Sequence, residues 1–183
     1  RDPAELPLAR AAVARWSELD ARLGGRLGYR KRGNLRLARN DAEAEIIAAL
    51  VRDQTRAGLE IELLDGKAAR ALAPALSQTI VTASFCPGDG HADPINAVSA
   101  LADEARRLGA RIETGVEATA LIARSDRVVG ARTSAGDIEA GTVVVACGVG
   151  APGLLAPLGF ALPLALKIVL VLQSVPVPPM FEQ

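Results

Sequence analysis

Apolar residues recur every three or four positions in three stretches of the chain, and this spacing predicts three amphipathic helices. The stretches cover residues 3–23, 41–58 and 94–108. Asp41 is expected to cap the second helix and Asp93 the third, where Pro94 falls at the first helical position and its missing N–H costs nothing. A shorter helical segment is expected over residues 65–72, before Pro74. The segments between these helices must supply any strands.

Alternating apolar and polar residues, many of them β-branched, predict strands between the helices. Extended segments are expected at residues 27–31, 34–38, 60–64, 79–86 and 111–113. Three further segments joined by tight turns predict an antiparallel meander over residues 116–124, 127–133 and 137–140. Residues 142–147 (TVVVAC) are apolar on both faces, which is typical of a central strand in a parallel sheet. A meander leading into such a strand is unusual, because most crossovers in parallel sheets are helices.

The composition indicates a globular protein and excludes several functional classes. The 183 residues include 21 lysines and arginines against 21 aspartates and glutamates, so the chain lacks the basic surface of a nucleic-acid-binding protein. Half of the residues are hydrophobic, which is enough for a core. One histidine and two distant cysteines, Cys86 and Cys147, form no metal-binding pattern. Two free thiols favour a reducing compartment, so we expect a cytoplasmic protein or one peripheral to the inner face of the membrane.

The longest apolar run predicts a buried strand and no transmembrane segment. This run, residues 162–172, is interrupted by Lys167 and is about half as long as the roughly 20 residues that a membrane span needs. β-Branched residues follow Lys167, as in a strand. The chain begins at Arg1 rather than at a methionine, and we expect it to be an internal fragment of a longer protein.

Several short motifs occur in a characteristic order. Tyr29 to Ala38 has the form YR..G.L.LA, Gly90 to Pro94 reads GHADP ahead of the third helix, and residues 143–148 read VVVACG. Together with Gly115-Val116, these motifs resemble the D-amino-acid oxidase-like family of FAD-dependent oxidoreductases, which includes glycine oxidases, sarcosine oxidase β subunits and D-amino-acid dehydrogenases. The resemblance extends from about Leu6 to Ser174.

The resemblance implies an α/β (α+β) fold. It combines part of a Rossmann-like FAD-binding layer, including the three-stranded meander, with part of the mixed sheet of a substrate domain. Residues 1–86 are then expected in the substrate-binding domain, residues 87–160 in the FAD-binding domain, and residues 161–183 in a truncated return strand. The family's GxGxxG unit would precede Leu6, and its substrate-carboxylate arginine would follow Gln183.

The resemblance also assigns candidate cofactor residues. The family uses the backbone N–H and C=O at the position of Val116 to bind the adenine edge of FAD. Ala146, Cys147 and Gly148 are small, so the backbone there could pass close to the AMP half of the cofactor. The alternatives are an ordinary valine at a strand start and a glycine-rich turn that serves only packing. Cys147 is expected to be a small apolar residue and not a redox centre.

Residues 148–153 (GVGAPG) match GxGxxG but are not expected to bind a dinucleotide. Pro157 and Gly159 interrupt the long helix that the motif requires. Residues 160–181 contain no acidic residue to bind the ribose. His91 is either a hydrogen-bond partner of flavin or substrate, or a polar residue in the loop before the third helix. No metal site is expected.

The resemblance implies an enzyme that oxidises a small amino acid or N-alkyl amino acid. Hydride would pass from the carbon beside the nitrogen to FAD, and the imine would hydrolyse. Because the flavin supplies the hydride chemistry, no acid–base residue need lie in this chain. The electron acceptor and any partner subunits stay open, and the GHADP form is similar to that of hetero-oligomeric members. The alternative is a non-catalytic α/β module that binds a partner protein through an exposed sheet edge.

Overall fold

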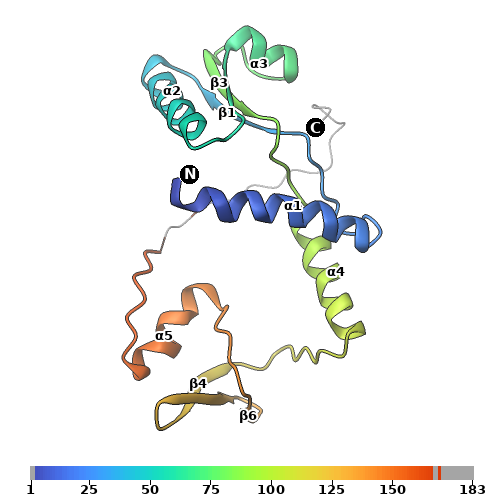
Figure 1. Ribbon diagram of the computed structural model, residues 1–183, viewed down its shortest axis with the longest axis vertical. Coiled ribbons are helices and arrows are strands. Elements are labelled where there is room, and N and C mark those ends of the chain that lie inside the picture. The colour runs from blue at the N-terminus through green and yellow to red at the C-terminus, as the bar shows by residue number, and fades with distance from the viewer. Residues whose placement is uncertain (1–2, 167–168, 170–183) are drawn as a thin grey trace. The chain divides into compact units, whose positions relative to one another are not determined.

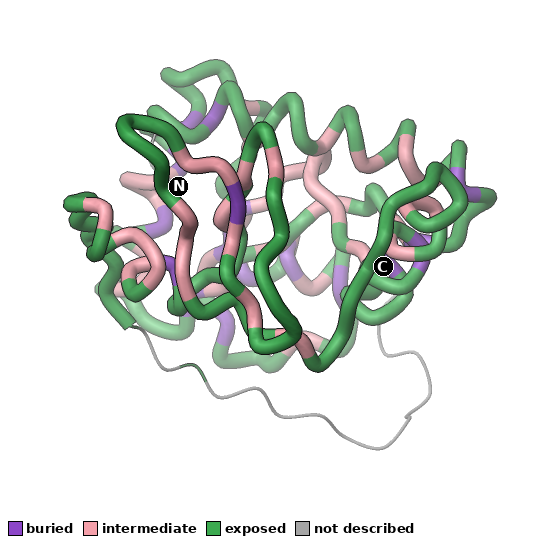
Figure 2. The backbone as a smooth tube through the Cα atoms, turned by 90° about the horizontal axis from the view of Figure 1, so that it is seen from below, coloured by how far each residue is buried: buried purple, intermediate pink, exposed green. Residues whose placement is uncertain are grey.

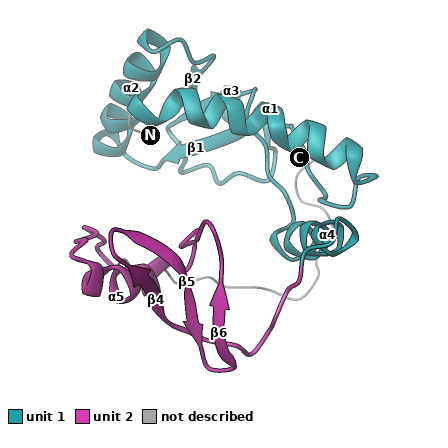
Figure 3. Cartoon of the chain, turned by 60° about the horizontal axis from the view of Figure 1, so that its bottom comes forward, with its two compact units in different colours: residues 1–110, 174–183 teal, residues 111–173 magenta. Residues whose placement is uncertain are grey.

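The computed structural model describes residues 3–166 and residue 169, and it consists of helices and two antiparallel sheets (Figure 1). Helices and strands are mixed along the described chain, as expected for an α/β (α+β) fold. The described residues separate into two compact units, the first ending at Ala110 and the second beginning at Arg111 (Figure 3). The boundary between the units thus follows the third predicted helix, residues 94–108, whereas the expected domain boundary after residue 86 precedes that helix. The assignment of residues to substrate and FAD domains stays a prediction.

The described residues of unit 1 form four α-helices. They are α1 (Leu6–Arg22), which follows a 3-10 turn over Pro3–Glu5, α2 (Asp41–Arg56), α3 (Gly66–Leu72) and α4 (Pro94–Arg107). Asp93 caps α4 as predicted, because its Oδ1 accepts hydrogen bonds from the N–H groups of Ile95 and Asn96, both at 2.9 Å. The expected cap of α2 is wrong by one residue. Asn40, and not Asp41, accepts the N–H of Glu43 at 2.9 Å.

The sheet of unit 1 has three strands, β1 (Asn34–Ala38), β2 (Glu62–Asp65) and β3 (Thr82–Cys86). Their order is β1-β3-β2, and both pairs are antiparallel. Helix α2 packs against one face, where Ile47 and Val51 meet Ala38. The extended segment expected at residues 27–31 is reduced to a single bridge between Arg30 and His91.

A second apolar cluster joins α4 to the end of α1. Leu23 and Leu27 are buried there against Ala97 and Ala100 of α4. Beside them the Trp16 and Tyr29 rings stack with centroids 6.2 Å apart. Buried positions are sparse elsewhere along the backbone (Figure 2).

Unit 2 contains the predicted meander. Its strands are β4 (Ala118–Arg124), β5 (Arg127–Thr133) and β6 (Gly136–Glu139), paired antiparallel in that order. The tight turn between β4 and β5 places Ser125 at φ 56°, in the left-handed region. After the sheet, the short helix α5 (Ala151–Leu155) lies between two 3-10 turns and contacts β4.

Two predicted strands are wrong. Residues 142–147 and 111–113 adopt no strand, and Val144 is 82% exposed. A buried parallel strand requires hydrogen-bonded neighbours, and no described segment pairs with residues 142–147. The return strand expected within residues 161–183 is absent from the described residues 161–166, and the rest of it lies outside the described part. No described helix is long and apolar enough to cross a membrane.

Candidate cofactor and substrate site

Val116 lies two residues before β4, and its peptide group is unpaired within the described part of the chain. The next residue, Glu117, is held to Ser134, whose Oγ accepts its N–H at 3.0 Å and whose N–H donates to its C=O at 2.9 Å. The N–H and C=O of Val116 itself form no hydrogen bond with any described residue. Gly115, with φ 72°, turns the chain just before it. A free donor beside a free acceptor is the pattern that an adenine edge can bind.

Residues 146–148 form an open segment of small residues. Ala146, Cys147 and Gly148 are all exposed, and Gly148 has φ 54°. No atom lies within 4 Å of the place that a Cβ on Gly148 would occupy, so the backbone there is accessible. Cys147 carries a free thiol, and the other cysteine, Cys86, belongs to unit 1. The role of Cys147 as a small apolar residue stays a prediction.

The GxGxxG-like segment does not form a dinucleotide turn. Residues 148–150 make a 3-10 turn, and α5 ends after five residues. The prediction that no long helix begins at this motif is confirmed. Within the described part of unit 2, no helix has the length of a pyrophosphate-binding one.

These observations test whether unit 2 fits FAD. The free peptide group at Val116 and the open backbone around Gly148 fit the adenine half of such a cofactor. The described residues of unit 2 offer nothing comparable for the pyrophosphate. The assignments of Val116, Ala146, Cys147 and Gly148 therefore stay predictions, and each concerns only the AMP end.

His91 lies in unit 1, in the loop before α4. Its backbone N–H donates to the C=O of Arg30 at 3.0 Å, and the N–H of Arg30 donates back at 2.8 Å. The exposed imidazole forms no hydrogen bond within the described residues and borders a hollow of about 200 Å³. The remaining lining residues are Gly33, Asn34, Leu35, Ala73, Leu76 and Gly90. The proposed contact of His91 with substrate or flavin stays a prediction.

A larger cleft in unit 1 was missed by the sequence interpretation. It has a volume of about 630 Å³ and is lined by α1, α2 and one face of the sheet. Two buried polar residues, Gln54 and Ser84, line it. Gln54 continues the Ile47–Val51 stripe of α2, so a polar residue on the apolar face was the available signal.

Cys86 also lines this cleft. Its side chain is half-buried, and burial, followed by the nearby Asp89 carboxylate, raises the pKa of its thiol above the ordinary value. No described group of three or more His, Cys, Asp or Glu side chains could hold a metal ion.

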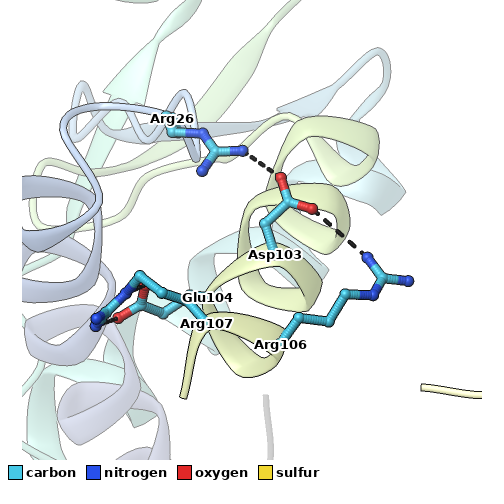
Figure 4. Close-up of polar contacts among 5 residues, drawn as sticks. All are labelled: Arg26, Asp103, Glu104, Arg106 and Arg107. Carbon is cyan, nitrogen blue, oxygen red and sulfur yellow. Dashed lines mark hydrogen bonds and ion pairs between the residues drawn. The ribbon is translucent and has the colours of Figure 1, made fainter. Parts of the chain in front are cut away.

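The charged residues of α4 pair with one another and with the α1–β1 connection (Figure 4). Asp103 binds Arg26 at 2.6 Å and Arg106 at 3.5 Å, while Glu104 binds Arg107 through two contacts of 2.7 Å. Hydrogen bonds from Arg107 hold the pKa of Glu104 below its ordinary value. These arginines therefore do not form a free basic patch.

The comparisons with known proteins identify the family. The model of the family described as FAD dependent oxidoreductase (DAO) matches residues 1–179, so the chain belongs to this family. A D-amino acid dehydrogenase of Rhizorhabdus wittichii is 32% identical over 159 residues, which cover 85% of this chain and 38% of the relative. A 4-methylaminobutanoate oxidase (formaldehyde-forming) of Paenarthrobacter nicotinovorans is 30% identical over 160 residues, covering 86% of this chain and 19% of the relative.

Solved structures agree with the family. The glycine oxidase of Bacillus cereus has a TM-score of 0.73 at 31% identity, covering 82% of this chain and 43% of that one. The glycine oxidase of Geobacillus kaustophilus has a TM-score of 0.79 at 26% identity, covering 88% and 44%. The chain thus spans less than half the length of these relatives. Their family is one of FAD-dependent amino-acid oxidases and dehydrogenases, as the motifs implied.

Proposed function

We propose that the whole protein oxidises the C–N bond of a small amino acid or N-alkyl amino acid with FAD as its cofactor. The observation that carries this proposal is the family match over residues 1–179. Relatives named for D-amino acids, methylaminobutanoate and glycine favour this substrate class. Bound FAD would accept the hydride from the carbon beside the nitrogen. The imine left behind would hydrolyse to a keto or aldehyde product.

Within this enzyme the residues of the present chain would bind and orient FAD and the substrate, and would not take part in the hydride transfer. The backbone of Val116 would hold the adenine edge, and Ala146, Cys147 and Gly148 would let the AMP half approach closely. His91 would lie beside flavin or substrate. The groups that bind the pyrophosphate and the substrate carboxylate would correspond to the parts of the relatives that this chain does not cover.

The electron acceptor stays open between oxygen and a respiratory or partner-subunit acceptor. The named relatives include both dehydrogenases and oxidases, which supports either outcome. A dehydrogenase would pass its electrons to a partner subunit or a respiratory acceptor.

The two free cysteines support the expected cytoplasmic location.

Anaerobic reduction of the whole protein tests this proposal. The purified protein is expected to be yellow, and its flavin absorbance should bleach on mixing with D-proline, sarcosine or glycine, at different rates. Readmitting oxygen should restore the colour quickly in an oxidase and slowly in a dehydrogenase. A whole protein that retains no flavin would contradict the proposal and favour the non-catalytic binding module.

A further inference from the structure

The cleft of unit 1 lies between two helices and the face of the sheet that they share. Helix α1 supplies one wall, α2 supplies a second, and β1 and β3 supply the floor. A contact of 3.4 Å from Arg10 of α1 to the C=O of Gly58 joins the helices at one end. The volume of about 630 Å³ lies within the range of about 300–1,000 Å³ that small-molecule sites occupy.

The two sides of the cleft differ in chemistry. The α1 wall is mainly apolar, with Leu6 and Val13 facing the space. The floor is polar, because β1 and β3 present Arg36 and Ser84, which stand opposite each other in the strand register. An occupant that is apolar along one side and polar at one end would match both surfaces.

Two polar residues of the cleft are buried, with side-chain polar atoms that stay open to the space. Gln54 is 7% exposed and Ser84 is 4% exposed, and neither side chain forms a hydrogen bond within the described residues. Polar groups that are open to a cleft form their hydrogen bonds with water or with a ligand. Both line the cleft, so a bound polar group could satisfy them.

The cleft also holds cations without an ion pair. Lys31 and Arg36 line it, and no carboxylate lies within 4.0 Å of either among the described residues. The lining also contains two acidic side chains. Asp89 accepts the N–H of Gly90 at 2.9 Å, and Glu60 is exposed, as are Lys31 and Arg36. Unpaired guanidinium and ammonium groups beside an amide and a hydroxyl form a donor set suited to a carboxylate.

We propose that this cleft binds a monocarboxylate with a hydrocarbon body. The carboxylate accepts hydrogen bonds from Arg36 and Lys31 and satisfies Gln54 and Ser84, while the hydrocarbon lies along the apolar wall of α1. Nothing in this inference depends on flavin or on the proposed oxidation.

The two cysteines provide a direct test in the full 183-residue chain. Cys86 lines the cleft, and Cys147 is exposed in unit 2, so it serves as an internal control. Alkylation by neutral iodoacetamide is followed at each cysteine by peptide mass spectrometry, with increasing octanoate. Saturating octanoate is expected to slow alkylation of Cys86 about 10-fold and to leave Cys147 unchanged. An unchanged rate at Cys86, or equal slowing at both cysteines, overturns the proposal.

Other probes separate the sources of the carboxylate. Octylammonium, which has the same body and the opposite charge, is expected to protect Cys86 at least 10-fold less effectively than octanoate. Glycine and D-proline test whether a zwitterionic amino acid suffices. Protection by these amino acids at lower concentrations than octanoate would contradict the hydrocarbon body.

Variants test the residues of the proposed site. Arg36→Gln is expected to raise the octanoate concentration that half-protects Cys86 about 10-fold, and Arg36→Lys should raise it less. Gln54→Leu is expected to raise the same concentration about 5-fold. Arg52→Gln is the matched control on α2, because Arg52 is exposed and lies outside the lining, and it should leave half-protection unchanged. A variant that fails to fold is recognised because its Cys86 reacts as fast as in urea. Wild-type protection at Cys86 combined with no effect of Arg36→Gln overturns the assigned recognition.

Discussion

Gly33 is one of the glycines of unit 1 at which a side chain would collide with its surroundings. Its φ is 88°, and a Cβ there would collide with the ring of Phe85. We expect Gly33→Ala to lower the free energy of unfolding by about 3 kcal/mol, of which about 1–2 kcal/mol is the left-handed backbone. Gly24→Ala is the control, because Gly24 has φ 67° with open space around it and should cost only about 1 kcal/mol. Urea denaturation measures both, and equal losses would contradict the steric contribution of Phe85.

The candidate adenine site yields a pair of substitutions with opposite expectations. Because Val116 would act through its peptide group, Val116→Ala should leave the FAD affinity of the whole protein almost unchanged. Gly148→Val should weaken FAD binding by about 2–3 kcal/mol, because a β-branched residue resists φ 54° and would cover the approach to the backbone. Flavin release on dilution measures both affinities. Equal, negligible effects would remove Gly148 from the site.

Single residues could be predicted where the requirement is local. Asp93 and Pro94 indicate the start of α4, because helix capping and proline geometry depend only on the next few residues. The cap of α2 was placed one residue late because Asn40 and Asp41 are both good caps, and only their backbone angles decide between them. Gln54 could not be recognised as part of a cleft, because its neighbours on α1 and β3 are far away in sequence.

At the scale of elements, α4 depends on its first turn. Asp93→Ala removes an acceptor for two N–H groups and is expected to destabilise unit 1 by about 1 kcal/mol, whereas Asp93→Asn should cost a few tenths. Ser99→Ala on the exposed face of the same helix should be neutral or slightly stabilising. Urea denaturation compares the three variants. An equal loss of stability in Asp93→Asn and Asp93→Ala would mean that the Oδ1 acceptor of the cap contributes nothing.

The Glu104–Arg107 pair gives α4 a pH-dependent contribution. Hydrogen bonds from Arg107 lower the pKa of Glu104 in the folded chain, so the pair stabilises the fold above the ordinary carboxyl pKa. This contribution is lost as pH falls through the lowered value. Glu104→Gln should therefore be destabilising at neutral pH, and its difference from the wild type should shrink below about pH 4. Urea midpoints across this range measure the difference. A difference that is constant with pH would contradict the assignment.

Helices and strands were predicted with unequal success for a physical reason. The spacing that identifies α1, α2 and α4 is carried by each helix itself, and the hairpins of β4, β5 and β6 are closed by local turns. Residues 142–147 have the composition of a buried strand, yet a strand exists only where another segment supplies hydrogen bonds. No described segment does so, and Val144 is exposed instead.

At the scale of the whole molecule, the order of motifs predicted more than any one of them. The motifs at residues 29–38, 90–94 and 143–148 are each short, yet together they indicated the family that the match over residues 1–179 shows. The division into units after residue 110 had no comparable signal, because α4 packs on Leu23 and Leu27 through contacts distant in sequence. Local pattern and motif order thus specified the fold class, and long-range packing set the unit boundary.

The 183-residue chain is expected to be colourless and inactive when purified alone. FAD binding in this family requires amide donors at a helix N-terminus for the pyrophosphate and an acidic partner for the ribose. Among the described residues the GxGxxG-like segment leads only into the five-residue α5, so these donors are not provided there. The free peptide group of Val116 and the open backbone at Gly148 leave only the adenine end, worth about 4 kcal/mol or millimolar affinity.

Dialysis against excess FAD followed by an absorbance spectrum measures this directly. Turnover is assayed with glycine, sarcosine and D-proline and an artificial electron acceptor, with the whole protein as the positive control. The chain should lose its flavin on dialysis, because millimolar affinity cannot retain a ligand at micromolar protein. The whole protein should stay yellow and reduce the acceptor. Stoichiometric flavin in the isolated chain, or turnover above the blank, would show that its own residues supply the pyrophosphate and ribose contacts.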